Sequence, residues 1–301
     1  MRRFLASLLG LPALLALPII VGANPGPLRI MTSIFPLAEF AKEIAADRGE
    51  VSLLLPPGAG IHTWQPRASD IVRLSSADIF IQIGAGLEPW IDGLLKSVSS
   101  SKLSVLRVAD ALPLEEHAHS KEGEMESDPH VWLDFGLDMK IADMIAARLA
   151  EMDPPGAAVF QAGAARLKAK LQNLDAAYVR GLGRCAGKDL IIGGHAAFGY
   201  LAKRYGLRAL SLSGLSPDAE PRPSRVMEAV SWGRQHHIRA VFMEANASPK
   251  MAEMLARELR AEILVLHAGA NLSKKEWESG RSFFDIMEEN LVNLKKGLAC
   301  E

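Results

Sequence analysis

The sequence predicts an α/β protein with two lobes, each a mostly parallel sheet flanked by helices, and one long helix that joins them. Short apolar segments alternate with amphipathic helical segments in both halves of the chain, which is typical of parallel sheets with helical connections. Between the halves, one helical pattern runs over 153–182. At 1.5 Å per residue such a helix would be about 45 Å long. We therefore expect a first lobe over 24–152, a linking helix over 153–183 and a second lobe over 184–301.

The N-terminal segment 1–23 predicts a secretory signal peptide. Two arginines precede an apolar run over 4–21, and small residues at 21–23 favour cleavage near Ala23. The alternative is a transmembrane anchor, which two prolines inside the run disfavour. No later segment approaches the ~18 uncharged apolar residues that span a bilayer, and no cysteine lies near the cut. We expect an exported protein in the periplasm, without a membrane anchor after cleavage.

Each element is expected where its hydrophobic period is clearest. Strands are short β-branched and apolar runs between turn residues, and helices show apolar residues three and four apart. Before the linking helix, strands are expected at 28–32, 51–55, 79–83 and 103–108, and helices at 36–46, 69–74 and 137–152. Ser69 is the expected cap of the second helix, and the polar segment 115–128 is expected to be a mobile loop. After the linking helix, strands at 190–192, 208–212, 240–243 and 263–266 alternate with helices at 196–205, 223–235, 249–259 and 283–298.

The composition excludes several classes of protein. The chain has 301 residues with 34 basic and 35 acidic side chains, and the net charge of -1 argues against a nucleic-acid binder. An apolar share of 49% is too high for a disordered chain. Two cysteines cannot build a disulfide scaffold or a four-cysteine zinc site. They leave room for one disulfide, between Cys185 and Cys300, or for two thiols.

Four of the eight histidines stand where ligand residues are expected. His62, His195 and His267 each follow a predicted strand, and His130 precedes a predicted helix. In open parallel sheets, ligands bind outside the carboxyl ends of the strands. The alternative is that the four are unrelated surface or core histidines. No short local metal motif such as H-E-x-x-H or C-x-x-C is present, so a metal site would have to be assembled from distant segments.

At these histidines the sequence resembles a known family, the zinc/manganese substrate-binding proteins of bacterial ABC importers, often called cluster 9 or A-I. The resemblance implies two α/β lobes joined by a rigid backbone helix, with the metal held between them. The matching segments, in the family's order, are His62-Thr63-Trp64-Gln65-Pro66 with Ser69-Asp70, Gly84-Ala85-Gly86-Leu87-Glu88-Pro89-Trp90, Asp128-Pro129-His130-Val131-Trp132-Leu133-Asp134, His195-Ala196-Ala197-Phe198-Gly199-Tyr200, and Glu244 with Ser248-Pro249-Lys250.

The resemblance also implies a ligand set. His62 and His130 match the ligands of the first lobe, and His195 matches the first ligand of the second lobe. The fourth family ligand is usually an aspartate, and here His267 stands in its place. An all-imidazole shell favours Zn²⁺ over Mn²⁺, which prefers oxygen ligands, although copper, nickel and cobalt also accept imidazole. Glu244 is a candidate for orienting an imidazole N–H, or it only caps the following helix.

The function implied is a non-enzymatic, monomeric receptor that captures Zn²⁺ and hands it to the membrane permease of an ABC importer. One alternative is an Mn²⁺ or Fe²⁺ receptor of the same fold. Another is a zinc-dependent hydrolase, in which Glu244 would be the base. Because histidine must be neutral to bind a metal, binding is expected to weaken as the pH falls through about 6.

Two features lie outside this ligand set. His117 and His119, among acidic residues, are either low-affinity zinc collectors or part of a solvated loop. The pair His236-His237 stands at a predicted helix end, where cationic side chains suit the helix dipole, and it is interpreted as structural.

Overall fold

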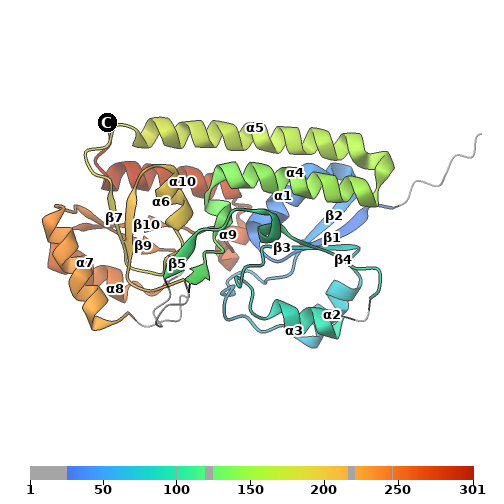
Figure 1. Ribbon diagram of the computed structural model, residues 1–301, viewed down its shortest axis with the longest axis horizontal. Helices are drawn as coiled ribbons and strands as arrows, with labels where there is room; N and C mark the ends of the chain where they lie inside the picture. Colours follow the sequence, from blue (N-terminus) through green and yellow to red (C-terminus); the bar gives the residue numbers. More distant parts are fainter. Residues whose placement is uncertain (1–25, 99, 119–124, 216–220, 246) are drawn as a thin grey trace, which may run out of the picture.

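A computed structural model of the protein describes residues 26–98, 100–118, 125–215, 221–245 and 247–301. Two four-stranded parallel sheets lie side by side, and the long helix α5 runs above both of them (Figure 1). The predicted signal peptide and its cleavage site lie outside the described residues. Within the described part of the chain, no helix is both long enough and apolar enough to cross a membrane.

The first lobe is built on a sheet with the strand order β2-β1-β3-β4, in which every pair is parallel. Ile30 pairs with Val51 on one side and with Ile79 on the other. The strands are β1 (Leu28–Thr32), β2 (Gly49–Leu53), β3 (Ile79–Gln82) and β4 (Ser104–Arg107). The helices are α1 (Phe35–Ala45), α2 (Ala68–Ser75), α3 (Ile91–Ser97) and α4 (Phe135–Met152).

The second lobe repeats this architecture with the order β10-β9-β7-β8, again all parallel. Because parallel strands share one direction, the segments that follow β7, β9 and β10 emerge at the same edge of the sheet. The strands are β7 (Asp189–Ile192), β8 (Arg208–Ser211), β9 (Ala240–Glu244) and β10 (Glu262–Leu266). The helices are α6 (Gly199–Arg204), α7 (Pro223–Gln235), α8 (Lys250–Leu259), α9 (Lys274–Glu278) and α10 (Phe283–Gly297).

The linking helix α5 (Ala157–Leu182) has 26 residues and follows a 3₁₀ turn at Pro154–Gly156. It packs on α1 and α4 of the first lobe and on α10 of the second. Gly163 permits the contact with α1, because a Cβ there would lie 2.6 Å from the backbone of Ile44. At the other end, the buried Tyr178 hydroxyl donates a hydrogen bond to the carbonyl of Met287 at 2.6 Å. One helix thus binds both lobes.

The two lobes also share one hydrophobic core. A continuous cluster of buried side chains runs from the first sheet through the helices to the second sheet. Phe40 of α1 meets Phe283 of α10 edge to face, with ring centroids 5.4 Å apart. A smaller cluster lies on the outer face of the second sheet, under α7 and α8. The lobes are therefore packed against each other as well as linked by α5.

Several local expectations were wrong. The segment expected as a mobile loop contains a short antiparallel pair, β5 (Glu116–Ala118) with β6 (Met125–Ser127). Ser69 does not cap α2, which begins one residue earlier, and the Arg67 N–H instead donates to the carboxylate of Asp70 at 2.9 Å. Helix α6 starts only at Gly199 because the preceding residues form a turn after β7. The short helices α3 and α9 were not predicted, since neither is long enough to show a clear period.

Cys185 and Cys300 form a disulfide that joins the segment after α5 to the end of the chain. We expect Cys185→Ser with Cys300→Ser to lower the free energy of unfolding by about 2–5 kcal/mol, because the bond closes a loop of 115 residues. Urea denaturation of both proteins measures the difference. Reduction of the unmodified protein serves as the control and should have the same effect. A loss below about 0.5 kcal/mol, ordinary for a surface substitution, would contradict the expectation.

Candidate metal centre

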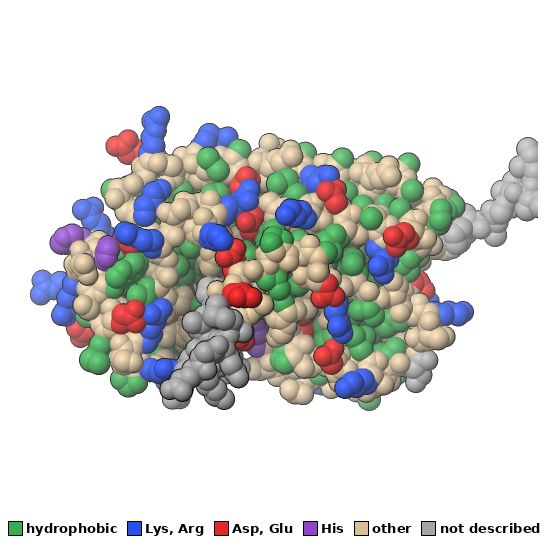
Figure 2. Space-filling view, in the orientation of Figure 1, with side chains coloured by type: hydrophobic (Ala, Val, Ile, Leu, Met, Phe, Trp, Pro, Cys, Tyr) green, Lys and Arg blue, Asp and Glu red, His purple; other side chains and the backbone are tan. Residues whose placement is uncertain are grey.

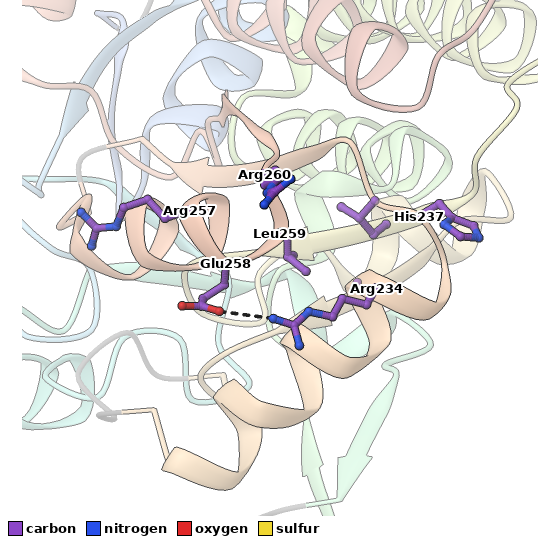
Figure 3. A pocket seen from close by; sticks show the side chains of 8 residues that line it. Arg234, His237, Arg257, Glu258, Leu259 and Arg260 are labelled. Atoms are coloured by element: carbon purple, nitrogen blue, oxygen red, sulfur yellow. Dashed lines mark hydrogen bonds and ion pairs between the residues drawn. The ribbon is translucent and has the colours of Figure 1, made fainter.

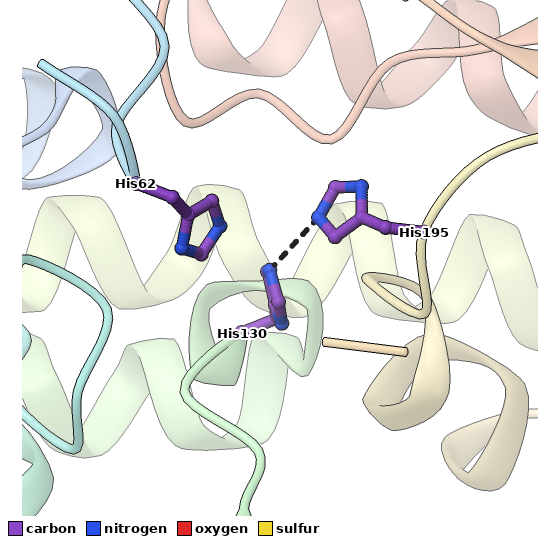
Figure 4. Close-up of side chains that lie close together, drawn as sticks. All are labelled: His62, His130 and His195. Carbon is purple, nitrogen blue, oxygen red and sulfur yellow. Dashed lines mark hydrogen bonds between the residues drawn. The ribbon is translucent and has the colours of Figure 1, made fainter. Parts of the chain in front are cut away.

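Three of the predicted histidines come together between the lobes. His62, His130 and His195 each offer one ring nitrogen, and these atoms all lie within 4.8 Å of one another (Figure 4). They belong to three segments that are far apart in the sequence and to both lobes. Within the described residues this is the one group of three or more potential ligands. Figure 2 shows a histidine side chain at the surface near the middle of the molecule, on a face where acidic and basic side chains are intermixed.

His62 is carried by the loop that follows β2. The carbonyl of the adjacent Ile61 accepts a hydrogen bond from the indole N–H of Trp90 at 2.8 Å, and the Trp90 ring packs edge to face on Trp64. From the second lobe, the side-chain amide of Asn271 donates to the carbonyl of Ala59 at 2.9 Å. The ligand-bearing loop is therefore fastened on both sides, although it has no regular secondary structure.

His130 is held by the aspartate two residues before it. The Asp128 Oδ1 atom accepts from the backbone N–H of His130 at 2.9 Å and contacts the ring Nδ1 at 2.7 Å. A neutral His130 ring therefore keeps its proton on Nδ1 and donates it in a hydrogen bond to the carboxylate, which leaves the lone pair on Nε2 free for a metal. Both residues are buried, with 0% and 1% of their surface exposed. Asp128 belongs to one of the segments that resemble the family, but its contact with the His130 ring was not predicted.

His195 has the same arrangement with a glutamate from the neighbouring strand. Its Nδ1 lies 2.6 Å from Glu244 Oε2, at the end of β9. Gly194 permits this approach, because a Cβ there would lie 2.8 Å from that oxygen. The Glu244 carboxylate thus contacts the His195 ring, as a residue that orients an imidazole would, and this role stays a prediction.

The two remaining ring nitrogens face each other across the lobe junction. His130 Nε2 and His195 Nε2 are 3.2 Å apart (Figure 4). With both Nδ1 protons directed at carboxylates, neither neutral ring has a proton for this contact, and two lone pairs oppose each other. Two nitrogens that bind zinc at 2.0–2.1 Å in a tetrahedron lie about 3.3 Å apart. The spacing therefore fits a cation between the rings.

Burial favours the neutral form of His62 and of His130. It lowers the pKa of His62 to about 3, and positive charge on His130 or His195 would lower it further. Burial also lowers the pKa of His130, although the contact with Asp128 acts in the opposite direction. The Nε2 atom of His62 is buried and has no hydrogen-bond partner among the described residues. Uncharged imidazoles with unshared lone pairs are the form in which histidine binds metals.

The structure does not bring His267 into this group, although it lines the same cavity of about 180 Å³. Its Nδ1 accepts a hydrogen bond from the backbone N–H of Gly269 at 2.8 Å. A neutral imidazole then carries its proton on Nε2, which lies 3.6 Å from Glu276 Oε2. This nitrogen is buried and makes no hydrogen bond to the described residues, and in this conformation it must lose its proton, or the ring must turn, before it can bind a metal. The cause is the tight turn at Gly269, whose φ of 76° directs its N–H back to the ring.

Carboxylates lie next to the ligand rings. Four neutral ligands would leave the +2 charge of the ion uncompensated, whereas Asp128 and Glu244 bring two carboxylates into contact with the ligand rings. Glu276, held by Ser273 and Arg281, adds a third carboxylate at the side of His267. Glu276 was not predicted, although the Ser273-x-x-Glu276 capping box was a readable signal.

The predicted collecting histidines remain untested. His117 lies on β5, but its side chain is not among those described, and His119 lies outside the described residues.

A second cavity, of about 600 Å³, lies where α7 and α8 end (Figure 3). Arg234, Arg257 and Arg260 line it together with His237, and Arg234 pairs with Glu258 at 3.3 Å. Cations at helix C-termini are explained by the helix dipole. The cavity is also at the end of the second sheet opposite to His195 and Glu244, since α7 and α8 end where the next strands begin. The histidine cavity is therefore the candidate site.

Comparison with known proteins identifies relatives along nearly the whole chain. The model of a family described as "Zinc-uptake complex component A periplasmic" matches residues 30–297. The high-affinity zinc uptake system protein ZnuA of Bacillus subtilis is 35% identical over 280 residues, which cover 90% of this chain and 88% of that protein. The zinc-binding lipoprotein AdcA of Streptococcus pneumoniae is 34% identical over 90% of this chain, but the match spans only 56% of AdcA.

A solved structure shows the same fold. The Zn(II)-bound ZnuA-like domain of AdcA from Streptococcus pneumoniae aligns with a TM-score of 0.76 and 33% identity. The alignment covers 91% of this chain and 99% of that domain. The two-lobed architecture with a long connecting helix is therefore the fold of these zinc-binding relatives.

Proposed function

The chain belongs to the family of periplasmic zinc-uptake complex component A proteins, and from that premise we propose that it captures Zn²⁺ between its lobes and delivers it to the membrane permease of an ABC importer. The observation that carries this proposal is the group of three buried imidazoles, two of which are oriented by carboxylates. The receptor would act in the periplasm as a monomer, after cleavage of a signal peptide near residue 23. Its lobes and linking helix would correspond to 24–152, 184–301 and 153–183.

In this proposal His62, His130 and His195 bind the ion through ring nitrogens. Zinc usually takes four ligands, so one position remains for water, for a carboxylate oxygen of Glu244, or for His267 if its ring turns away from Gly269. Three imidazoles with 3.2 Å between two of their nitrogens favour zinc over manganese, which prefers oxygen. An Mn²⁺ or Fe²⁺ receptor is the alternative of the same class.

A zinc-dependent hydrolase is the alternative of a different class, since three protein ligands and a water also describe catalytic zinc sites. The proposed base, Glu244, is 2.6 Å from His195 Nδ1 and is occupied in orienting that ring. The family is one of solute receptors, which also favours transport.

The test is equilibrium metal binding with the metal-free mature protein. We expect one high-affinity zinc per chain, and Mn²⁺ binding weaker by on the order of 100-fold or more in direct competition. Zinc at 1,000 times its Kd should also raise the free energy of unfolding by about 4 kcal/mol. Equal affinity for Mn²⁺ would favour the alternative receptor, and zinc-dependent hydrolysis of simple esters or phosphates would favour the enzyme.

The lowered pKa values revise the expected pH dependence. Three ordinary imidazoles with a pKa near 6.5 would be about three-quarters protonated at pH 6 and would release about two protons when zinc binds. Because burial lowers the pKa of His62 to about 3 and also lowers that of His130, we expect clearly fewer than two protons per zinc at pH 6. Calorimetry in buffers of different ionisation enthalpy counts these protons, and a value near two would contradict the burial argument.

The same shifts set the sign of the stability change in the metal-free protein. A histidine whose folded pKa lies below its unfolded value stabilises the fold fully above about pH 6.5. This contribution is lost as the pH falls toward the folded pKa, which for His62 is about 3. Acid should therefore weaken the metal-free fold progressively between about pH 6.5 and pH 3, which urea denaturation at a series of pH values measures.

A further inference from the structure

The short helix α6 (Gly199–Arg204) bridges the two lobes beside the metal site. It begins four residues after His195, so it belongs to the ligand-bearing segment of the second lobe. Its side chains nevertheless bond to the first-lobe segment that carries His130. None of these side chains lines the histidine cavity.

The first contact is made by Tyr200, which is 3% exposed. Its hydroxyl donates to the backbone carbonyl of Asp128 at 3.0 Å and accepts from the backbone N–H of Glu115 at 3.0 Å. Burial raises the pKa of Tyr200 to about 12, so the hydroxyl remains a donor at neutral pH. Asp128 is the residue whose carboxylate orients His130, and Tyr200 thus holds the backbone of that residue.

The second contact is made by Arg204, the last residue of α6. Its Nη1 donates to Asp134 Oδ1 at 2.7 Å, while Nε and Nη2 donate to the two oxygens of Asp175 on α5 at 2.7 and 2.8 Å. The same Asp134 oxygen caps α4 by accepting from the N–H of Gly136 at 2.7 Å. Arg204 therefore joins α6 both to the linking helix and to the start of α4.

The two contacts lie on either side of His130 in the sequence, at Asp128 and Asp134. We propose that Tyr200 and Arg204 are positioning residues that hold the His130 and His195 rings at zinc-binding distance across the lobe junction, in the absence of metal. A site whose ligands are already in place loses less freedom when the ion binds, which raises affinity mainly by slowing release. This inference rests on the proposed zinc-binding function.

Tyr200→Phe removes the hydroxyl and keeps the ring. We expect the zinc affinity to fall about 10-fold, within the range for outer partners of metal ligands, and zinc release to a chelator to accelerate by a similar factor. The stoichiometry should stay at one, and the absorption of the Co²⁺-substituted protein should keep the pattern of an unchanged ligand set. Tyr178→Phe is the matched control, because it removes another buried hydroxyl bonded to a carbonyl, that of Met287. It should lower stability without changing zinc affinity.

Gly136→Ala tests the second contact without changing any charge. A methyl group there would lie 2.5 Å from Arg204 Nη1, so the flexible end of the arginine must move away from Asp134. We expect lower zinc affinity and faster release with an intact fold. Gly93→Ala is the control, because a Cβ at this helical glycine meets nothing within 4 Å.

The outcomes separate this inference from the proposed function. If Tyr200→Phe and Gly136→Ala bind and release zinc as the unmodified protein does, the positioning role is wrong while the receptor function stands. The same conclusion follows if Tyr178→Phe weakens zinc binding as much as Tyr200→Phe. If the unmodified protein itself binds no zinc, both proposals are wrong.

Discussion

Alanine in place of His130 is expected to lower the zinc affinity by about 100- to 1,000-fold. Binding free energies of structural zinc sites, about 10–16 kcal/mol over four ligands, correspond to about 3 kcal/mol per ligand, and 1.4 kcal/mol is a factor of ten. His130 is 1% exposed and its Nε2 lies 3.2 Å from that of His195, so no other described side chain can take its place without moving. The change should appear in titrations against a competing chelator, and His195→Ala should behave alike.

Two further variants make this test specific. His237→Ala removes an exposed histidine at the far end of the second lobe and should leave zinc affinity unchanged. His267→Ala distinguishes a site with three histidine ligands from one in which His267 is the fourth ligand. Because its Nδ1 accepts from Gly269, we expect its removal to cost less than 10-fold. A loss as large as that of His130→Ala would show that the His267 ring turns to bind the ion.

Neutralising the two carboxylates that contact the ligand rings is expected to have the second large effect on zinc affinity. Asp128→Asn and Glu244→Gln keep the size of each side chain but remove the charge and the preference for an N–H partner. Each should lower zinc affinity by about 10- to 100-fold, because outer partners fix the tautomer and raise the basicity of the ligand ring. Competitive titration measures both, and the bound zinc should remain at one per chain.

A surface carboxylate provides the comparison. Asp92 pairs with Arg107 at 3.0 Å, and its side chain is 75% exposed. Asp92→Asn should leave zinc binding unchanged, because an exposed pair contributes little and lies outside the cavity. If Asp128→Asn and Glu244→Gln also left the zinc affinity unchanged, the two carboxylates would have no part in holding the ion.

These carboxylates give the proposed site a charge balance suited to a transported ion. Two negative charges at the outer nitrogens match the +2 charge of zinc without entering its coordination shell. The imidazoles remain neutral ligands that can exchange. We expect a site of this kind to hold zinc tightly and still release it when the lobes or loops shift.

Much of the fold could be predicted from the sequence because its signals are local. The strand at 28–32 and the helix at 223–235 have the expected bounds, since apolar periodicity and a proline at the helix start mark them clearly. The β5–β6 pair escaped prediction because each strand has only three residues, too few to show an alternation of apolar and polar side chains. Short helices such as α9 are decided by capping and packing, which a hydrophobic period does not reveal.

From the sequence and its family resemblance, His62, His130, His195 and His267 were expected to converge on one site, and the ring nitrogens of the first three lie together. Strand–helix alternation places loops that follow parallel strands at one edge of each sheet, so topology brings such residues together whatever their side chains do. The motifs around these histidines also carried the resemblance to metal receptors.

Only the tertiary structure decided which atoms face the cavity. His267 follows the carboxyl end of β10, where a ligand is expected. Its Nδ1, however, accepts a hydrogen bond from the backbone N–H of Gly269, so a neutral ring carries its proton on the other nitrogen. Asp128, Glu244 and the α6 side chains hold the remaining rings through hydrogen bonds between segments that no sequence pattern pairs. Ring orientation depends on loop conformation and on contacts between the two lobes. Both form only when the lobes pack against each other and against α5.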